Sequence, residues 1–207
     1  MYKLSHFTET DEERVFEFMQ KTTFSLITGI YKDCPVATHV PLDVKRKNGK
    51  VILTGHIMKG TDHHKAFAEN EKVLVIFSGP HCYVSASWYA KKNVASTWNY
   101  MDVHAIGIIR LTGEEETKKI IEDLTNKYEG PESEAAFSKL PEEYVNRLVK
   151  AIAGFHIEVE SVENVFKLSQ NHDEVTRKQI IENLRKTGDY FAAEIAREME
   201  VQMNNKK

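Results

Sequence analysis

Cysteine, proline and long apolar runs are scarce in this sequence. Its 207 residues include two cysteines and no Cys-x-x-Cys pair, which fits a reduced, cytoplasmic protein without a disulfide framework. Five prolines and ten glycines exclude a collagen-like or disordered chain. No segment approaches the ~20 apolar residues of a membrane span, and residues 1–7 lack the apolar core of a signal peptide. We therefore expect a cytoplasmic globular protein with no membrane segment.

The charge balance disfavours one class of partner. Lysine and arginine together number 28, against 31 aspartates and glutamates, for a formal net charge of -3. This balance argues against a basic nucleic-acid binder, although it permits a local basic patch.

Common catalytic and cofactor motifs are missing as well. The chain has no G-x-x-x-x-G-K-[ST] phosphate loop, no G-x-G-x-x-G, no G-x-S-x-G and no H-E-x-x-H. Nucleotide hydrolysis, a Rossmann dinucleotide site and a zincin site are therefore disfavoured. His56, His81 and His104 come from three predicted strands and could converge on zinc or a heme iron. No ligand spacing supports this arrangement, so no metal site is predicted.

The first 111 residues are rich in short β-type segments with few helices between them. The stretch 32–34 and the Asn-Gly pair at 48–49 predict hairpin turns. Short connections favour antiparallel pairing, and the density of strands favours a small barrel or sandwich. Gly79-Pro80 is expected to end one strand before the next begins. The predicted strands are 24–30, 35–42, 51–57, 73–78, 81–86 and 100–111.

Helices dominate the rest of the chain. Thr10 with Glu13, and Thr112 with Glu115, form S/T-x-x-E patterns that predict helix starts. The segment 155–162 alternates in polarity and predicts a late strand that returns to the barrel. The expected organisation is one domain at 1–172, with inserted helices at about 113–152, and a helical extension of it at 173–207.

Polar and aromatic side chains concentrate in the segments 79–89, 97–104 and 166–171. Aromatic rings beside Ser, Thr and Asn supply the flat walls and hydrogen-bonding groups that a planar heteroaromatic ligand needs. The same composition would also suit a core edge or a dimer interface. Lys59 and Thr61 lie at the start of a predicted helix, where they could hold a phosphate or form a solvated turn.

Five segments together resemble a known family. They are PVATHVPL (35–42), LTGHIMKG (53–60), IFSGPHCYVSASWY (76–89), STWNYMDVHAIG (96–107) and FKLSQN (166–171). In the same order, over nearly the whole chain, they are similar to the PaiB-type FMN-binding negative transcriptional regulators. That family belongs to the split-barrel class related to pyridoxamine-phosphate oxidases and flavin reductases. One departure is Lys59-Gly60-Thr61-Asp62, where the family has a basic-Ala-Asn-Pro-like continuation.

The resemblance implies a mainly β fold with α elements. This is an antiparallel, Greek-key-like split β-barrel with flanking helices and a C-terminal helical tail, usually a homodimer with FMN between the protomers. Thr38 and His39 would lie near the isoalloxazine, and His56 and Lys59 near the ribityl chain and phosphate. The other implied FMN-binding residues are Ser85, Trp88, Tyr89, Thr97, Trp98, Asn99, His104, Lys167 and Gln170.

The implied function is negative transcriptional regulation. The sequence has no helix-turn-helix pattern, so direct DNA binding is unsupported and indirect regulation remains open. One alternative is an FMN-dependent oxidoreductase or flavin reductase, in which His39 or His104 could donate a proton. A second is a heme-binding split barrel. No catalytic residue is assigned.

Overall fold

The computed structural model describes residues 1–2, 4–91 and 93–204. These residues form two compact units, between which three long strands continue. Unit 1 comprises Met1–Phe16, Ser78–Val103 and Glu163–Lys207. Unit 2 comprises Glu17–Phe77 and His104–Val162. Each unit is described by itself below.

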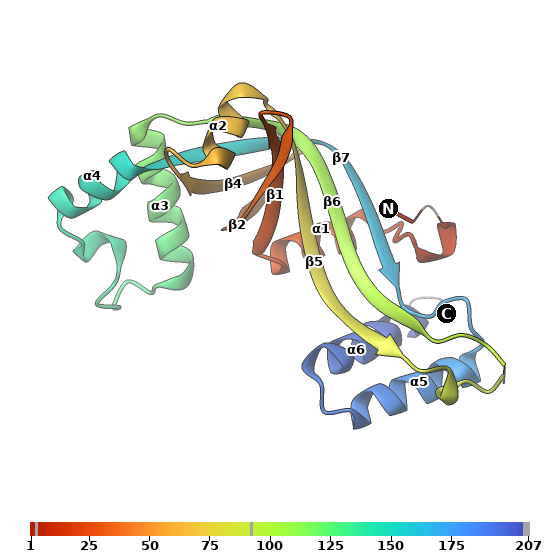
Figure 1. Cartoon of the computed structure of the whole chain (residues 1–207). Helices are drawn as coiled ribbons and strands as arrows, with labels where there is room; N and C mark the ends of the chain where they lie inside the picture. Colours follow the sequence, from red (N-terminus) through yellow and green to blue (C-terminus); the bar gives the residue numbers. More distant parts are fainter. Residues whose placement is uncertain (3, 92, 205–207) are drawn as a thin grey trace. The chain divides into compact units, whose positions relative to one another are not determined.

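One antiparallel sheet contains seven strands (Figure 1). The strands are β1 (Phe24–Tyr31), β2 (Cys34–Pro41), β3 (Asp43–Lys47), β4 (Lys50–Met58), β5 (Lys72–Val84), β6 (Thr97–Leu111) and β7 (Ile152–Lys167). Their order across the sheet is β2-β1-β5-β6-β7-β4-β3. The two outermost strands, β2 and β3, are consecutive in the chain and separated only by Leu42, and β2 also contacts β4. The sheet therefore curls on itself within unit 2, as the predicted barrel requires.

Alternating side chains explain the core of unit 2. In β4, Leu53 and Ile57 are buried, whereas Thr54 and His56 between them are only partly buried. This period of two directs one face of the strand into the barrel and the other outward. The largest fully buried side chains of this core are Met19, Ile27, Leu42, Leu53, Phe67, Phe77, Ile109, Phe155 and Ile157.

Both predicted hairpin turns are confirmed. Lys32 and Asp33 join β1 to β2 with φ of 49° and 61°, and Asn48 and Gly49 join β3 to β4 with φ of 53° and 78°. Positive φ at both central residues is the conformation of two-residue hairpin turns that match the twist of the strands.

The strand prediction around Gly79-Pro80 is wrong. β5 runs through this pair without a break, and the strand β3 was not predicted. The pairing of β1 with β5 extends only from Leu74 to Ile76. Because β1 no longer accompanies β5 at Pro80, the missing proline N–H leaves no ladder bond unmade with that strand.

Helices flank the sheet in both units. They are α1 (Glu12–Lys21), α2 (Asp62–Glu69), α3 (Glu114–Tyr128), α4 (Glu142–Ala151), α5 (Glu174–Lys186) and α6 (Tyr190–Asn204), with short 3₁₀ turns η1 (Ser5–Phe7), η2 (Ala86–Trp88) and η3 (Phe137–Lys139). In unit 2, α3 contacts α4 and β4. In unit 1, α5 packs on α6 around buried Ile180, Leu184, Ile195 and Met199.

The predicted caps of two helices are corrected by the structure. Asp11, not Thr10, caps α1, because its Oδ1 accepts from the backbone N–H groups of Glu13 at 3.0 Å and Arg14 at 3.3 Å. Gly113 is the N-cap of α3. Thr112 cannot serve there because its N–H still donates to Gly154 O at 2.9 Å and its hydroxyl pairs with Thr117.

In the described part of the chain, no helix is both long and apolar enough to span a membrane.

Candidate functional site

The residues predicted to bind the cofactor divide between the two units. Unit 2 contains Thr38, His39, His56, Lys59 and His104. Unit 1 contains Ser85, Trp88, Tyr89, Thr97, Trp98, Asn99, Lys167 and Gln170. The structure thus brings the predicted residues together as two separate groups, which are described in turn.

In unit 2, His56 is distinguished by a ring nitrogen with no partner. It lies near the end of β4, opposite Gly154 of β7. Its Nδ1 is buried and makes no hydrogen bond in the structure. Burial also lowers the pKa of His56 below its ordinary value, because the charged imidazolium is poorly solvated there. The neutral ring is therefore favoured, and its buried Nδ1 is a polar atom that the chain itself leaves unsatisfied.

Lys59 follows His56 in the turn between β4 and α2. Its backbone N–H donates to Ala151 O at 2.9 Å, which fixes the turn, while its side chain is exposed. Thr61 is the N-cap of α2 and accepts from the His64 N–H at 3.3 Å. The His63 N–H donates to Asp62 at 2.7 Å. Because side chains already occupy these first-turn amides, the Lys59 ammonium is the group that remains available to an anion.

Strand β2 brings Thr38 and His39 into the same unit. His39 is exposed and stacks on Phe24 of β1, with ring centroids 5.6 Å apart and planes inclined by 21°. At Gly55, beside His56, a Cβ atom would lie 3.0 Å from Pro41 O. This close approach places the end of β2 directly against the Gly-His pair of β4.

In unit 1, Lys167 is drawn into a partly apolar position. Its ammonium donates to the Thr97 hydroxyl and lies over the Phe7 ring, 5.7 Å from the centroid. Burial lowers the pKa of Lys167. The predicted residues Thr97 and Lys167 are therefore neighbours, from β6 and the end of β7.

Two other predicted residues of unit 1 use their side chains within the protein. Asn99 is fully buried, and its Nδ2 donates to Ser169 Oγ at 2.9 Å while its Oδ1 accepts from the same hydroxyl at 3.1 Å. The amide of Gln170 accepts from Leu168 N at 2.7 Å and donates to Phe166 O. These bonds brace the turn after β7, in which Ser169 has a positive φ of 59°.

The Ser-x-Ser-Trp-Tyr segment forms a capped 3₁₀ turn. Ser85 is its N-cap and accepts from the Ser87 N–H at 3.2 Å. Tyr89 is only 3% exposed, and its hydroxyl is buried without a partner. Burial raises the pKa of Tyr89. The Tyr89 ring lies 4.6 Å from that of His172, measured between ring centroids. After His56 Nδ1, the Tyr89 hydroxyl is the second unsatisfied polar group among the predicted residues.

Exposed aromatic rings gather beside this turn. Trp98 is 53% exposed and lies 6.0 Å from Tyr83 and 6.2 Å from His81, measured between ring centroids. His81 in turn lies 5.0 Å from Phe191 of α6. An exposed apolar cluster of this kind marks a surface that a ligand or a protein can cover.

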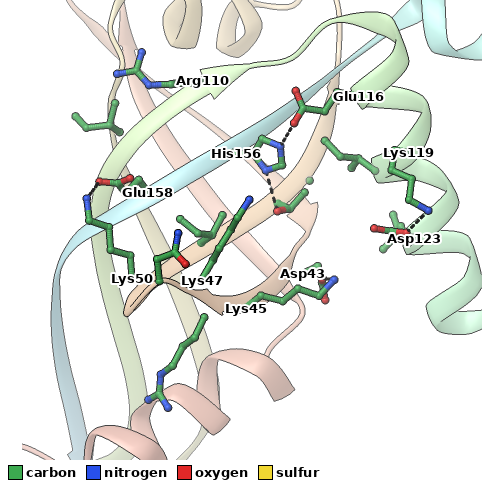
Figure 2. Close-up of a pocket in the computed structure, with 18 of the residues that line it drawn as sticks. Asp43, Lys45, Lys47, Lys50, Arg110, Glu116, Lys119, Asp123, His156 and Glu158 are labelled. Atoms are coloured by element: carbon green, nitrogen blue, oxygen red, sulfur yellow. Dashed lines mark hydrogen bonds and ion pairs between the residues drawn. The ribbon is translucent and has the colours of Figure 1, made fainter.

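A cavity of about 850 Å³ in unit 2 was not predicted (Figure 2). Its lining comes from the end of β2, the β3–β4 hairpin, α3 and the parts of β6 and β7 in this unit, and it includes none of the predicted site residues. No motif joins these segments, which are distant in sequence. The only trace in the sequence is the basic run Lys45-Arg46-Lys47 beside the Asn-Gly turn.

Comparison with known proteins identifies the family. The model of a family described as "Putative FMN-binding domain" matches residues 1–161. The chain belongs to this FMN-binding domain family. A relative from Bacillus subtilis, named protease synthase and sporulation protein PAI 2, is 34% identical over 201 residues, which cover 97% of each chain. An uncharacterized protein of Emericella nidulans, AN0679, is 31% identical and covers 78% of this chain and 81% of its own.

Solved structures support the fold of the FMN-binding domain family. The FAD and heme binding protein from Mycobacterium smegmatis superposes with a TM-score of 0.61 at 14% identity, covering 88% of this chain and 80% of that one. The flavocytochrome Anf3 from Azotobacter vinelandii gives 0.62 at 14% identity, covering 80% and 72%. The predicted family and the predicted split-barrel fold are both confirmed.

The residues of unit 2 suit the ligand that the family name implies. A flavin mononucleotide carries a phosphate dianion and a polar ribityl chain, which need a cation and hydrogen-bonding groups. Lys59 provides an exposed cation, and His56 provides a buried nitrogen without a partner. The individual residue assignments remain predictions.

Proposed function

We propose that this protein binds FMN as a homodimer and acts as a negative transcriptional regulator of the PaiB type. His56 and Lys59 would hold the ribityl-phosphate end of the flavin, and Thr38 and His39 would lie along its ring system. When bound, FMN supplies hydride and single-electron chemistry. The chain's own residues would bind and orient the ligand.

The buried, unpartnered Nδ1 of His56 carries this proposal. Buried polar groups are nearly always hydrogen-bonded, and leaving one unpaired costs about 1–3 kcal/mol. This unsatisfied nitrogen and the exposed ammonium of Lys59, three residues later in the chain, support a polar, anionic ligand at this end of β4. Membership of the FMN-binding domain family supports a flavin as that ligand.

Fluorescence titration of FMN against two variants tests the residue assignment. Lys59→Glu is expected to weaken FMN binding by about 10–100-fold, because it removes a charge-assisted hydrogen bond and adds repulsion. His56→Ala is expected to weaken binding about 3–10-fold, the range of one neutral hydrogen bond.

His6→Ala is the matched control, because His6 is an exposed histidine of unit 1 outside the predicted site. It should bind FMN as the parent protein does. Circular dichroism melts establish that each variant is folded. Folded Lys59→Glu and His56→Ala proteins with unchanged FMN affinity would contradict the assignment.

The regulation that we propose does not involve direct contact with DNA. The net charge of -3 disfavours direct contact with DNA, which itself repels an acidic protein. We therefore propose regulation through a bound metabolite or another protein. A mobility-shift assay at 50 and 200 mM salt is expected to give no shifted band with promoter DNA. A band that weakens steeply with salt would overturn the indirect mode.

Redox or heme chemistry is the alternative function, favoured by structures of similar fold that are described as a flavocytochrome and an FAD and heme binding protein. NAD(P)H oxidation with added FMN tests the oxidoreductase version. A Soret band after heme reconstitution tests the heme version. Loss of NAD(P)H oxidation in the Trp98→Ala variant would support an enzymatic function.

A further inference from the structure

We propose that the cavity between the β3–β4 hairpin and α3 binds a second ligand, a phosphorylated small molecule of nucleotide size. It contains none of the predicted flavin residues, so this inference is independent of the proposed function. The phosphate would contact Lys47, and the apolar or planar part of the ligand would lie on the aliphatic side chains of the wall. The argument rests on the size, the lining and the charge of the cavity.

Size and lining fit one small molecule. The volume of about 850 Å³ falls within the ~300–1,000 Å³ of typical ligand pockets. The apolar part of the lining is Pro41, Ile52, Ile108, Ile120 and Leu124. These residues come from strands and from α3, so ordered elements rather than loops form the wall.

His156 connects α3 to the sheet at this wall through two hydrogen-bonding contacts. His156 of β7 lies with Nδ1 3.1 Å from the Thr54 hydroxyl and Nε2 2.8 Å from Glu116 Oε1. These two contacts require Nε2 to donate to the carboxylate and Nδ1 to accept from the hydroxyl when the ring is neutral. Figure 2 shows His156 between β4 and α3, so its two contacts link these elements at the wall of the cavity.

The charge of the cavity favours an anion. Six lysine or arginine side chains line it against four carboxylates, although the whole chain has a net charge of -3. Most of the cations are paired with carboxylates: Lys45 with Asp43 at 2.7 Å, Lys119 with Asp123 at 3.0 Å, Arg110 with Glu71 at 3.2 Å, and Lys50 with Glu158.

Lys47 is different from these paired cations. Among the residues that the structure describes, it has no carboxylate partner, and Figure 2 shows its side chain extending over β4 toward His156. Its positive charge is therefore not neutralised by the protein. A phosphate group on a ligand can therefore pair with this ammonium without displacing a carboxylate of the protein.

The four carboxylates narrow the class of ligand. Asp43, Glu116, Asp123 and Glu158 line the same cavity, so an extended polyanion such as nucleic acid would meet repulsion along its length. A compact mono- or diphosphate group on an otherwise neutral molecule avoids most of this cost. The aliphatic wall then adds affinity for a ring or chain that inorganic phosphate lacks.

Isothermal titration calorimetry of the full chain at low salt tests the proposal with ADP, adenosine and pyrophosphate as probes. ADP is expected to bind at least tenfold more tightly than either adenosine or pyrophosphate, because only ADP engages both the cation and the apolar wall. Lys47→Glu is expected to weaken ADP binding at least tenfold.

Lys32→Glu provides the matched control, since Lys32 is an exposed lysine beside the other hairpin turn of unit 2 and does not line the cavity. It should leave ADP binding unchanged. Absence of heat with all three probes would overturn the proposal, as would equal ADP affinities of the Lys47→Glu and Lys32→Glu proteins.

Competition with FMN separates this proposal from the proposed function. If FMN binds, ADP affinity is expected to be the same with and without saturating FMN, and the Lys59→Glu variant should bind ADP normally. Displacement of ADP by FMN would mean that the cavity is not a second site. Absence of FMN binding would overturn the proposed function and leave the ADP result to stand alone.

Discussion

Two side chains of the predicted site, His56 and Tyr89, each have a buried polar atom without a hydrogen-bond partner. Most such atoms in folded proteins are satisfied by protein or water, so these two are the polar atoms of the predicted site that the protein's own groups leave unpaired. Asn99 shows the opposite behaviour, because Ser169 already occupies its amide. The residues that the resemblance implies therefore divide into those with an unsatisfied polar atom and those whose polar groups are already paired within the protein.

The partial burial of His56 predicts that the stability of the protein depends on pH. Burial lowers the pKa of His56, so the folded protein takes up this proton less readily than the unfolded chain. The contribution of His56 to the free energy of unfolding should be fully present above the unfolded pKa of ~6.5. It should be lost as the pH falls below that value. The free energy of unfolding in urea, measured at pH 7.5 and 5.5, should decrease less for His56→Asn than for the parent. An equal decrease in both proteins would contradict this explanation, and His6→Asn serves as the control.

The Asn99 network predicts a stability cost rather than a binding cost. Asn99→Ala removes a buried amide and leaves the Ser169 hydroxyl without that partner, which should lower the free energy of unfolding by about 1–3 kcal/mol. Asn146→Ala, at an exposed position of α4, should stay within ~0.5 kcal/mol of the parent. Urea unfolding measures both, and similar values for the two variants would refute the structural role.

At the scale of elements, the approach of β6 to β7 depends on a glycine. A Cβ atom at Gly107 would lie 2.5 Å from Glu158 O, a backbone atom that cannot rotate away. Gly107→Ala is therefore expected to destabilise the protein by about 1–3 kcal/mol, as overpacking does. Gly130→Ala, where a Cβ would meet nothing within 4 Å, is the control. Thermal and urea unfolding should separate the two, and equal stabilities would contradict the close approach.

Local chemistry decided which elements could be predicted from sequence. The turns at 32–33 and 48–49 were predictable because residues with positive φ are needed between paired strands, and Asn-Gly meets that need. The continuation of β5 through Pro80 was not predictable, because whether proline ends a strand depends on how far the neighbouring strand extends. The prediction of the α3 cap was wrong for a similar reason, since the Thr112 N–H is still hydrogen-bonded to Gly154 of β7.

The candidate site was only partly predictable. His56 and Lys59 lie close together in sequence within one motif, so their common location in unit 2 could be expected. The cavity around Lys47 could not be expected, because its wall is formed by residues between Pro41 and Glu158 that share no motif. These residues lie near one another only because of the strand order of the sheet. The boundary at residue 172 between the barrel domain and its helical extension remains a prediction.

At the scale of the whole molecule, the proposed homodimer predicts the mass in solution. Light scattering coupled to size exclusion should give twice the 23.8 kDa of one chain. The exposed rings of Tyr83, Trp98 and Phe191 are apolar surface that a second copy could cover. A monomer at micromolar concentration would exclude a stable dimer.

Binding of FMN by the purified protein tests the central claim most directly. Titration with FMN and with riboflavin, followed by flavin fluorescence and by thermal shift, compares ligands that differ by the phosphate alone. Saturable quenching, a raised melting temperature and at least tenfold tighter binding of FMN than of riboflavin are expected, because the phosphate would meet the Lys59 ammonium. The absence of both quenching and thermal shift with FMN would contradict the flavin assignment.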